Sequence, residues 1–441
     1  VWLITRMGMA RRAAESLRKF CVAARSEHSF ESLCVVGLGY IGLPTAAIFA
    51  SHGVQVLGVD IDQQTVDLIN NGKAQNVEPE LNLVVNTAVA NGHLRAATAP
   101  APADVFIIAV PTPFKDDHQP DLTCLQAAVE SLAAAIKAGD LVVVESTVPV
   151  GTTEQVSTWL ANLCPGLKFP HAAGDEADVF IAHSPERVLP GRVMVELAEN
   201  DRVIGGISNR CAERAAEFYK IAVNGQSLMT TARTAELVKL SENAYRDVNI
   251  AFANELSRVC DRLQIDTWET VELANHHPRV NVLQPGPGVG GHCIAVDPWF
   301  IVSSAPDETD LIRAARKINN SKPGHVVKQI KDLAVGIDFP KVACLGLAYK
   351  ADIDDLRESP AVEIVRQLAA TGMREILVVE PYVNSLPDSL ADLDRTRLCD
   401  LDTALSLADI VVLLTDHRVF REFDRKVLTR KRILDTRGAW R

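Results

Sequence analysis

A glycine-rich turn near the start of the chain limits its possible folds more than any other stretch. Residues 37–42 follow the GxGxxG pattern, between a short apolar run at 33–36 and a helix expected at 44–51. A second apolar run, residues 54–59, ends in Asp60. This order of strand, turn, helix and strand indicates a dinucleotide-binding βαβ unit. In such a unit the glycines let a pyrophosphate approach the backbone, and the N-terminus of the helix faces it.

Asp60 indicates which dinucleotide this unit would bind. It follows Gly42 by 18 residues, about where a carboxylate takes the ribose hydroxyls of NAD. The same carboxylate would repel the additional phosphate of NADP. We therefore expect NAD as the cofactor.

Polar loops follow the next strands of the expected sheet. These strands are predicted at residues 105–110, 141–144 and 179–182. Ligands of a parallel sheet bind at the carboxyl ends of its strands, so Thr112 and Thr147 should face the cofactor. A turn or a helix N-cap is the alternative for each threonine. Glu186 follows the third strand, and its position fits either a catalytic or substrate-binding role or a plain surface glutamate.

The final segment looks like a reduced copy of the first fold. Its strands are predicted at residues 341–347, 376–379, 409–415 and 433–435. Its glycine turn is reduced to Gly346, and Lys350 and Arg357 follow it. These cations fit a second phosphorylated ligand, with a surface ion pair as the alternative.

A long helix is expected between the two halves. Residues 234–263 contain no proline or glycine and carry an apolar stripe with a period near 3.6. The polar residues of the helix share one face, which is either solvated or a buried polar site: Glu236, Lys239, Asn243 and Asp247. We therefore expect an α/β protein with two Rossmann-like, doubly wound domains joined by a long central helix, which is also suited to form a dimer surface.

A second glycine-rich loop precedes Cys293. Residues 285–291 are almost entirely proline and glycine, so they form neither helix nor strand and can approach a ligand closely. Asp297 follows Cys293 by four residues. The thiol is suited to act as a nucleophile if nearby cations or backbone N–H groups lower its pKa. A buried, unreactive cysteine after a turn is the alternative.

Composition limits the partners and the compartment. A chain of 441 residues should form two or three domains, and its net charge of −11 argues against nucleic acid or an anionic membrane as the main partner. No apolar run is long enough to span a membrane. The nine cysteines lack CxxC or Cys/His pairing, which is typical of a reducing compartment, so we expect a cytoplasmic protein. His276 and His277 have no third ligand at a plausible spacing, so we expect no metal site.

The first residues differ from the rest of the chain. They are basic and alanine-rich, and the periodic pattern begins only at Leu33. We expect residues 1–31 to be a poorly ordered extension. A transit peptide and an upstream stretch translated in error are the alternatives.

From about residue 32 onward, the chain resembles the UDP-glucose/GDP-mannose dehydrogenase family of nucleotide-sugar 6-dehydrogenases. The matching stretches are GLGYIGLPTA, VDID, VPTPF, ESTVPVGTTE, SPERVLPG, AELVKLSENAYRDVNIAFANE, GPGVGGHCIAVDP and LGLAYKADIDDLRESP. The resemblance implies an NAD-binding domain at residues 32–228, a central helical dimerisation domain with the cysteine loop at 229–330 and a UDP-sugar-binding domain at 331–441.

The chemistry that the resemblance implies is a two-step oxidation of the sugar C6 hydroxyl to a carboxylate, with two NAD per turnover. Cys293 would hold the aldehyde as a thiohemiacetal and then a thioester. Lys239 and Asn243 would stabilise the oxyanions, Asp297 would take a proton, and Glu186 would activate or place water. The implied cofactor residues are Gly37, Gly39, Tyr40, Ile41, Gly42, Asp60, Thr112, Thr147 and Arg357. The implied substrate residues are Arg187, Val188, Lys239, Asn243, Arg279, Gly290 and Lys350. Of these, Arg279 would reach the substrate of a second subunit, which implies at least a homodimer.

Details of the motifs bear on the sugar. SPERVLPG and the residues around GGHC are similar to those of family members that act on UDP-N-acetyl-D-mannosamine and serve surface polysaccharide synthesis. Arg187 replaces a phenylalanine of the UDP-glucose enzymes, His292 precedes the cysteine, and Pro190 stands where many of those enzymes have a glutamate. UDP-glucose, UDP-N-acetylglucosamine and its galactosamine epimer are the alternatives.

Two other classes of protein compete with this interpretation. A short-chain epimerase or dehydratase also keeps NAD and a UDP-sugar, but it needs a Tyr-x-x-x-Lys pair, which the chain does not contain. A non-catalytic NAD sensor would have no need for Cys293, Lys239 and Asp297 together.

Overall fold

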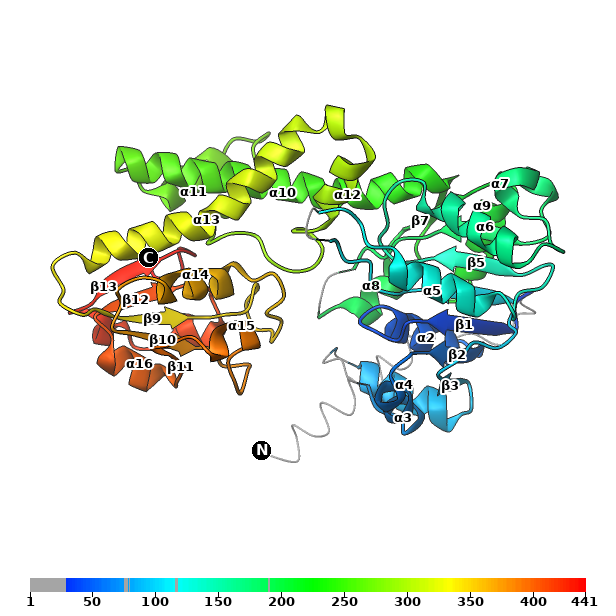
Figure 1. Ribbon diagram of the computed structural model, residues 1–441, viewed down its shortest axis with the longest axis horizontal. Helices are drawn as coiled ribbons and strands as arrows, with labels where there is room; N and C mark the ends of the chain where they lie inside the picture. Colours follow the sequence, from blue (N-terminus) through cyan, green and yellow to red (C-terminus); the bar gives the residue numbers. More distant parts are fainter. Residues whose placement is uncertain (1–28, 75–77, 79, 116–117, 189–190) are drawn as a thin grey trace. The chain divides into compact units, whose positions relative to one another are not determined.

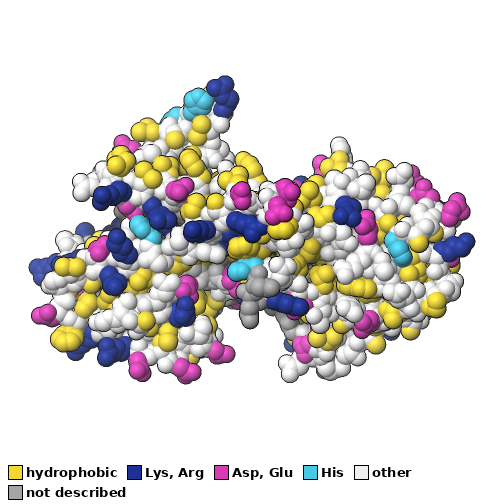
Figure 2. Space-filling model, turned by 45° about the horizontal axis from the view of Figure 1, so that its top comes forward, with side chains coloured by type: hydrophobic (Ala, Val, Ile, Leu, Met, Phe, Trp, Pro, Cys, Tyr) yellow, Lys and Arg dark blue, Asp and Glu magenta, His cyan; other side chains and the backbone are white. Residues whose placement is uncertain are grey.

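The computed structural model describes residues 29–74, 78, 80–115, 118–188 and 191–441. The expected N-terminal extension lies outside these residues except for its last few, of which Phe30 is buried against Phe218. The chain divides into two compact units, one ending at Leu240 and the other beginning at Ser241, and each is described by itself. In the described chain, no helix is both long and apolar enough to cross a membrane. On the face shown in Figure 2, acidic, basic and hydrophobic side chains are interspersed.

The first unit contains an eight-stranded sheet with the order β3-β2-β1-β4-β5-β6-β7-β8 (Figure 1). All neighbouring strands are parallel except β6 and β7. The strands are β1 Ser32–Val36, β2 Gln55–Val59, β3 Leu94–Ala97, β4 Val105–Ile108, β5 Leu141–Val144, β6 Phe180–His183, β7 Arg202–Gly206 and β8 Ser227–Thr231. The order 3-2-1-4-5 is the doubly wound order that the glycine turn predicts.

Helices cover both faces of this sheet because its strands are apolar on both sides. Leu33 and Val35 of β1 belong to one core, whereas Cys34 and Val36 belong to the other. The first core is closed by α2 Gly42–Ser51, α4 Leu81–Ala90, α8 Val193–Glu199 and α9 Asn209–Tyr219. The second is closed by α5 Thr123–Leu132 and α6 Thr152–Leu163. Helix α3 Gln63–Asn70 adds Val66 and Ile69 to the first core, and α7 Pro170–Ala173 is a short additional helix.

The second unit repeats this plan. Its sheet is parallel throughout, with the order β11-β10-β9-β12-β13 (Figure 1). The strands are β9 Lys341–Leu345, β10 Glu375–Val379, β11 Thr396–Leu398, β12 Ile410–Leu413 and β13 Arg432–Asp435. Its helices are α11 Thr267–Asn275, α12 Asp297–Ser304, α13 Asp310–Ala334, α14 Pro360–Ala369, α15 Asp388–Ala391, α16 Leu401–Leu407 and α17 Arg418–Glu422. The expected fold class is confirmed.

The internal repeat extends to single hydrogen bonds. Asp104 accepts from the Ser32 N–H at the start of β1, and Asp409 accepts from the Lys341 N–H at the start of β9, both at 2.9 Å. The strands expected to reach Val110, Leu347 and Thr415 each end two residues earlier. They end there because the chain turns into the loops at the carboxyl edge of each sheet, where ligands bind.

The long helix α10, Ala232–Leu263, runs for 32 residues. Its predicted apolar stripe divides into two sets. Leu240, Ala244 and Ala251 are buried, whereas Phe252 and Val259 are 57% and 46% exposed.

Candidate active site

The first glycine turn has the close packing of a dinucleotide-binding loop. The Gly37 N–H donates to the carbonyl oxygen of Val59 at 2.8 Å, and a Cβ on Gly42 would lie 1.8 Å from the Gly37 carbonyl oxygen. A Cβ on Gly39, in contrast, would meet none of the described protein atoms within 4 Å. Packing inside the protein therefore explains Gly42 but not Gly39, whose backbone is left open to a ligand.

Asp60 lies at the end of β2 beside this turn. Its half-buried carboxylate accepts hydrogen bonds from the backbone N–H groups of Leu38 and Asp62, both at 3.0 Å. Ile41 is the N-cap residue of α2. This arrangement fits a dinucleotide with a ribose at Asp60 and its pyrophosphate at the N-terminus of α2.

Hydrogen bonds join the loops around this turn. The Thr112 hydroxyl donates to the carbonyl oxygen of Thr147 at 2.5 Å, so the loops after β4 and β5 lie together. The buried carboxylate of Glu78 accepts from the Tyr40 hydroxyl, and from the Gly191 N–H at 2.7 Å. Glu78 thereby ties the glycine turn to the loop that carries Glu186. No motif marks Glu78 in the sequence.

Glu186 and Lys239 form an ion pair with 3.8 Å between carboxylate oxygen and ammonium nitrogen. Their side chains are only 14% and 8% exposed, so Glu186 is not a plain surface glutamate. The Val188 N–H also donates to Glu186. The Arg187 guanidinium donates to the carbonyl oxygen of Asp201 at 3.2 Å.

A second, buried ion pair lies near Glu186. The Arg202 guanidinium is 3.0 Å from the Glu145 carboxylate, and the Tyr219 ring centre is 4.5 Å from the same guanidinium. Burial raises the pKa of Glu145, while the positive charge of Arg202 opposes the rise and the negative charge of Glu186 adds to it. Sequence reasoning missed this pair, although Glu145 opens the motif after β5.

The polar face of α10 is buried. Glu236, Lys239, Asn243 and Asp247 are each at most 7% exposed, so the solvated alternative is wrong. Glu236 accepts from the backbone N–H groups of Gly151 and Thr153, at 2.6 and 2.7 Å, and from the Thr153 hydroxyl. Burial is the main cause that raises the pKa of Glu236. Further along the helix, Asp247 pairs with Arg316 of α13 at 2.7 Å.

The loop before Cys293 packs against the segment that follows β9. A Cβ on Gly290 would lie 2.6 Å from the Tyr349 Cβ, and one on Gly291 would lie 3.0 Å from the Tyr349 ring. The Gly291 N–H donates to the carbonyl oxygen of Arg357 at 3.0 Å. The segment after β9 therefore supports the loop from which the half-buried Cys293 projects.

Asp297 follows Cys293 at the start of α12. Its N–H donates to the Cys293 carbonyl oxygen at 2.8 Å. Its carboxylate is buried and accepts from the Asn243 amide at 2.6 Å. Asn243 follows Lys239 by four residues on α10, so consecutive turns of one helix carry both expected oxyanion donors.

The two expected cations after β9 differ in their surroundings. Arg357 forms a two-point ion pair with Asp355, at 2.9 and 2.6 Å. This hydrogen bonding is the main cause that raises the pKa of Arg357, and burial opposes the rise. Lys350 is exposed and, within the described chain, forms no hydrogen bond or ion pair. The surface-ion-pair alternative therefore applies to Arg357 alone.

Arg437 is a cation beside the cysteine loop that sequence reasoning missed. Its Nη1 atom is 2.7 Å from the place of a Cβ on Gly286, and its Nε donates to Asp416 at 3.0 Å. It follows the carboxyl end of β13, so the rule that ligands bind at strand ends could have found it. Arg279 is exposed, and its guanidinium has no hydrogen bond or ion pair with any residue that the structure describes.

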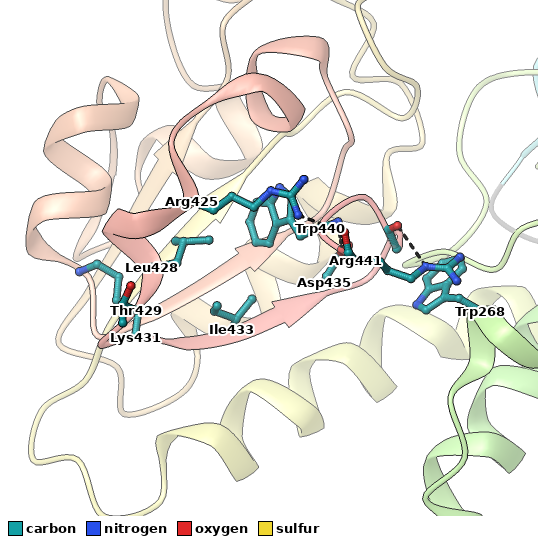
Figure 3. A pocket seen from close by; sticks show the side chains of 10 residues that line it. Trp268, Arg425, Leu428, Thr429, Lys431, Ile433, Asp435, Trp440 and Arg441 are labelled. Atoms are coloured by element: carbon teal, nitrogen blue, oxygen red, sulfur yellow. Dashed lines mark hydrogen bonds between the residues drawn. The ribbon is translucent and has the colours of Figure 1, made fainter.

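Two further features lie in the second unit. A cavity of about 420 Å³ is lined by Trp268, Arg425, Trp440 and Arg441 together with neighbouring residues of the C-terminal segment (Figure 3). Its described lining includes no predicted site residue. His276 and His277 are exposed, and among the described residues no group of His, Cys, Asp or Glu could hold a metal ion.

Comparisons with known proteins agree with these observations. Three models of the UDP-glucose/GDP-mannose dehydrogenase family match the chain in succession: the NAD binding domain at residues 31–223, the central domain at 233–321 and the UDP binding domain at 343–441. NDP-N-acetyl-D-galactosaminuronic acid dehydrogenase of Ralstonia solanacearum is 55% identical, over 94% of this chain and 97% of its own length. UDP-N-acetyl-D-mannosamine dehydrogenase of Campylobacter jejuni is 56% identical, over 90% of this chain and 97% of its own.

A solved structure supports the same assignment. That of a UDP-D-ManNAc dehydrogenase from Pyrococcus horikoshii matches with a TM-score of 0.85 and 38% identity, covering 93% of this chain and 96% of that one. Because the three domain models match in order, the chain belongs to the UDP-glucose/GDP-mannose dehydrogenase family of nucleotide-sugar dehydrogenases, and its first domain binds a dinucleotide.

Proposed function

We propose that the protein oxidises the C6 hydroxyl of UDP-N-acetyl-D-mannosamine to a carboxylate with NAD, and that the product serves surface polysaccharide synthesis. The observation that carries the proposal is the setting of Cys293. Its thiol belongs to a glycine loop whose Gly291 N–H donates to the carbonyl oxygen of Arg357. Asp297 follows Cys293 by four residues, and its carboxylate accepts from Asn243. The names of two relatives at 55–56% identity leave the N-acetyl-D-galactosamine epimer as the second candidate.

The first domain would hold NAD, which accepts a hydride in each of the two oxidations. Gly39 leaves room for the pyrophosphate, and Asp60 would take ribose hydroxyls and repel the phosphate of NADP. We divide the chain by function at residues 32–228, 229–330 and 331–441. We place the reaction in the cytoplasm, where a catalytic thiol stays reduced.

Cys293 carries the covalent chemistry of the proposed mechanism. Asp297 takes the proton of the C6 hydroxyl as the alcohol becomes an aldehyde. The Cys293 Sγ then bonds to the aldehyde carbon, and the carbonyl π-electrons move to oxygen, giving a thiohemiacetal alkoxide. Loss of hydride from that carbon restores the carbonyl as a thioester. Water then adds to the thioester carbon and the C–S bond breaks, which yields the carboxylate, the thiolate and protons.

The remaining residues hold charge and water. Lys239 and Asn243 donate hydrogen bonds to the substrate oxygen that becomes negative in the thiohemiacetal alkoxide and again when water adds to the thioester. The Glu186 carboxylate, paired with Lys239 at 3.8 Å, orients the attacking water and takes one of its protons. Lys350, exposed and without an internal partner among the described residues, neutralises a diphosphate oxygen.

The test is NADH formation with purified protein and four substrates: UDP-N-acetylmannosamine, UDP-N-acetylgalactosamine, UDP-N-acetylglucosamine and UDP-glucose. We expect two NADH per molecule of the first. Cys293→Ala should abolish this, whereas the exposed Cys124→Ser should retain it. Preference for another sugar would overturn the substrate assignment alone. Absence of NADH with every UDP-sugar would overturn the proposed function.

We also propose a homodimer formed through α10. Tyr245, Phe252 and Val259 recur at intervals of seven residues and are 72%, 57% and 46% exposed. Scattered exposed hydrophobic residues are ordinary, but a regular row on one helix face is typical of an interface. Arg279 would then serve the substrate site of the second copy. Light scattering should find a dimer that Phe252→Glu dissociates and the exposed α13 variant Lys328→Glu leaves intact; a wild-type monomer would contradict the proposal.

A further inference from the structure

The second sheet carries a carboxylate at the position that Asp60 occupies in the first. Glu380 directly follows β10, as Asp60 directly follows β2. Strand β10 pairs with β9, the first strand of the second sheet, as β2 pairs with β1, the first strand of the first sheet. Asp60 accepts from the Leu38 N–H. Glu380 accepts from the N–H groups of Leu347 and Ala348, at 2.7 and 2.9 Å. Asp60 is half-buried, whereas Glu380 is only 4% exposed.

His417 accounts for this difference. Its ring is fully buried, and Nε2 lies 3.0 Å from the same Glu380 oxygen. Its Nδ1 lies 2.8 Å from the Asp352 N–H. Because a backbone amide can only donate, Nδ1 is the acceptor, so the proton sits on Nε2 and is donated to Glu380. One oxygen of the Glu380 carboxylate therefore accepts from two backbone N–H groups and from the imidazole, which makes it an internal anchor.

The residue that His417 holds has an unusual backbone. Asp352 has φ of 60°, in the left-handed region that non-glycine residues rarely adopt. Besides its N–H bond to His417, its carboxylate accepts from the Tyr382 hydroxyl at 3.0 Å and from the Arg418 N–H at 2.9 Å. Such a conformation persists where surrounding groups fix it. We call these residues, with Glu380, the Asp352 clamp.

Asp352 lies in the segment 349–359, which carries Lys350 and also supports the Cys293 loop. Lys350 precedes Asp352 by two residues, and the Arg357 carbonyl that accepts from Gly291 follows in the same segment. The Tyr349 ring covers Gly291 from the other end of that segment. A shift at Asp352 would therefore move both the diphosphate cation and the support of the Cys293 loop.

We propose that His417 is a positioning residue: its Nδ1, by accepting from the Asp352 N–H, sets the segment 349–359 for UDP-sugar binding and for support of the Cys293 loop. The inference rests on the proposed function for its ligand, a uridine diphosphate group. It assigns His417 no contact with substrate or cofactor. It also gives a role to Glu380, which stands at the position of Asp60 but is hydrogen-bonded inside the second unit.

Two variants separate the hydrogen bonds of the ring. In His417→Asn the side-chain oxygen can stand in for Nδ1 and accept from Asp352, while the donor to Glu380 is lost. In His417→Gln the side-chain nitrogen can reach Glu380, while the acceptor for Asp352 is lost. Glu380 keeps its backbone donors in both variants. The half-buried His325→Asn on α13 is the control.

The first readout is calorimetric titration with UDP, with steady-state kinetics beside it. We expect His417→Gln to weaken UDP binding and raise the UDP-sugar KM by about tenfold, the effect of one lost hydrogen bond of this kind. His417→Asn should stay within about threefold of wild type, and the KM for NAD should not change in either. Equal loss in both variants, equal retention in both, or a matching change in the KM for NAD would overturn the inference.

The second readout needs no ligand. Alkylation of Cys293, followed by peptide mass spectrometry with exposed Cys124 as internal reference, should change in rate for His417→Gln but not for His417→Asn. An unchanged rate in both variants would overturn the link to the cysteine loop. Wild-type protein that binds no UDP would overturn the proposed function, and the alkylation rates would still decide whether His417 positions the loop.

Discussion

Gly39 and Gly42 belong to the same turn, yet alanine should act on them in opposite ways. A Cβ on Gly39 would meet none of the described protein atoms within 4 Å, and Gly39 is not among the glycines with positive φ. A Cβ on Gly42 would lie 1.8 Å from the Gly37 carbonyl oxygen. Gly39→Ala therefore tests the space left for a ligand, and Gly42→Ala tests the packing of the protein itself.

The magnitudes follow from these two environments. Gly39→Ala should stabilise the fold by about 0.4–1 kcal/mol, because alanine restricts the unfolded chain at a compatible backbone position. That corresponds to a rise of about 1–4 °C in Tm for a unit of this size. The same Cβ would displace a phosphate from the backbone N–H, and losing such a charged hydrogen bond costs about 1.5–3 kcal/mol. The KM for NAD should then rise roughly 10- to 100-fold.

The assay compares thermal unfolding without NAD with the KM for NAD. Gly39→Ala should unfold at or above the wild-type temperature and bind NAD poorly. Gly42→Ala should lower stability by about 1–3 kcal/mol, as overpacking does. An unchanged KM for NAD in Gly39→Ala, or an earlier unfolding of that variant, would refute the reasoning about the open backbone.

Three further predictions concern the second unit. Gly290→Ala should drive a Cβ against Tyr349, 2.6 Å away, and lower kcat about 100-fold by displacing the cysteine loop, with the KM for NAD unchanged; wild-type kcat would contradict this. Arg316→Met should lower the free energy of unfolding by about 3–5 kcal/mol, since it leaves the buried Asp247 carboxylate without its cation; an unchanged denaturation midpoint would count against it. Burial lowers the pKa of Lys322 from 10.5 to about 8, so the unfolded state binds more protons between these values. The free energy of unfolding of the wild type should therefore rise relative to that of Lys322→Met as the pH rises from about 8 to 10.5. A difference between the two proteins that does not change with pH would contradict this prediction.

The glycine turn and its neighbouring runs predict the fold well because each local feature favours the same structure. Gly37 to Gly42, the apolar strands and Asp60 specify a βαβ unit without any distant contact. The antiparallel strand β7, which begins at Arg202, was not predicted. Arg202 is buried against Glu145, a residue 57 positions earlier, and no local pattern encodes such a pairing.

The site was less predictable than the fold for the same reason. Cys293, Asp297 and Lys239 stand in motifs that mark them. Glu78 and His417 lie in no such motif, and their importance depends on which distant backbone groups they meet. On α10, periodicity identified a polar face but could not show that this face is buried, because a polar residue is buried only where partners such as Thr153 are available.

Glu236 makes the start of α10 and the start of α6 depend on each other. Its buried carboxylate accepts the N–H groups of Gly151 and Thr153, which open α6. These amides can exchange hydrogen with solvent only when α10 moves away, and α10 can move only by leaving a buried carboxylate without donors. The slow exchange of two amides in one helix should therefore report the opening of another helix, the one that carries Lys239.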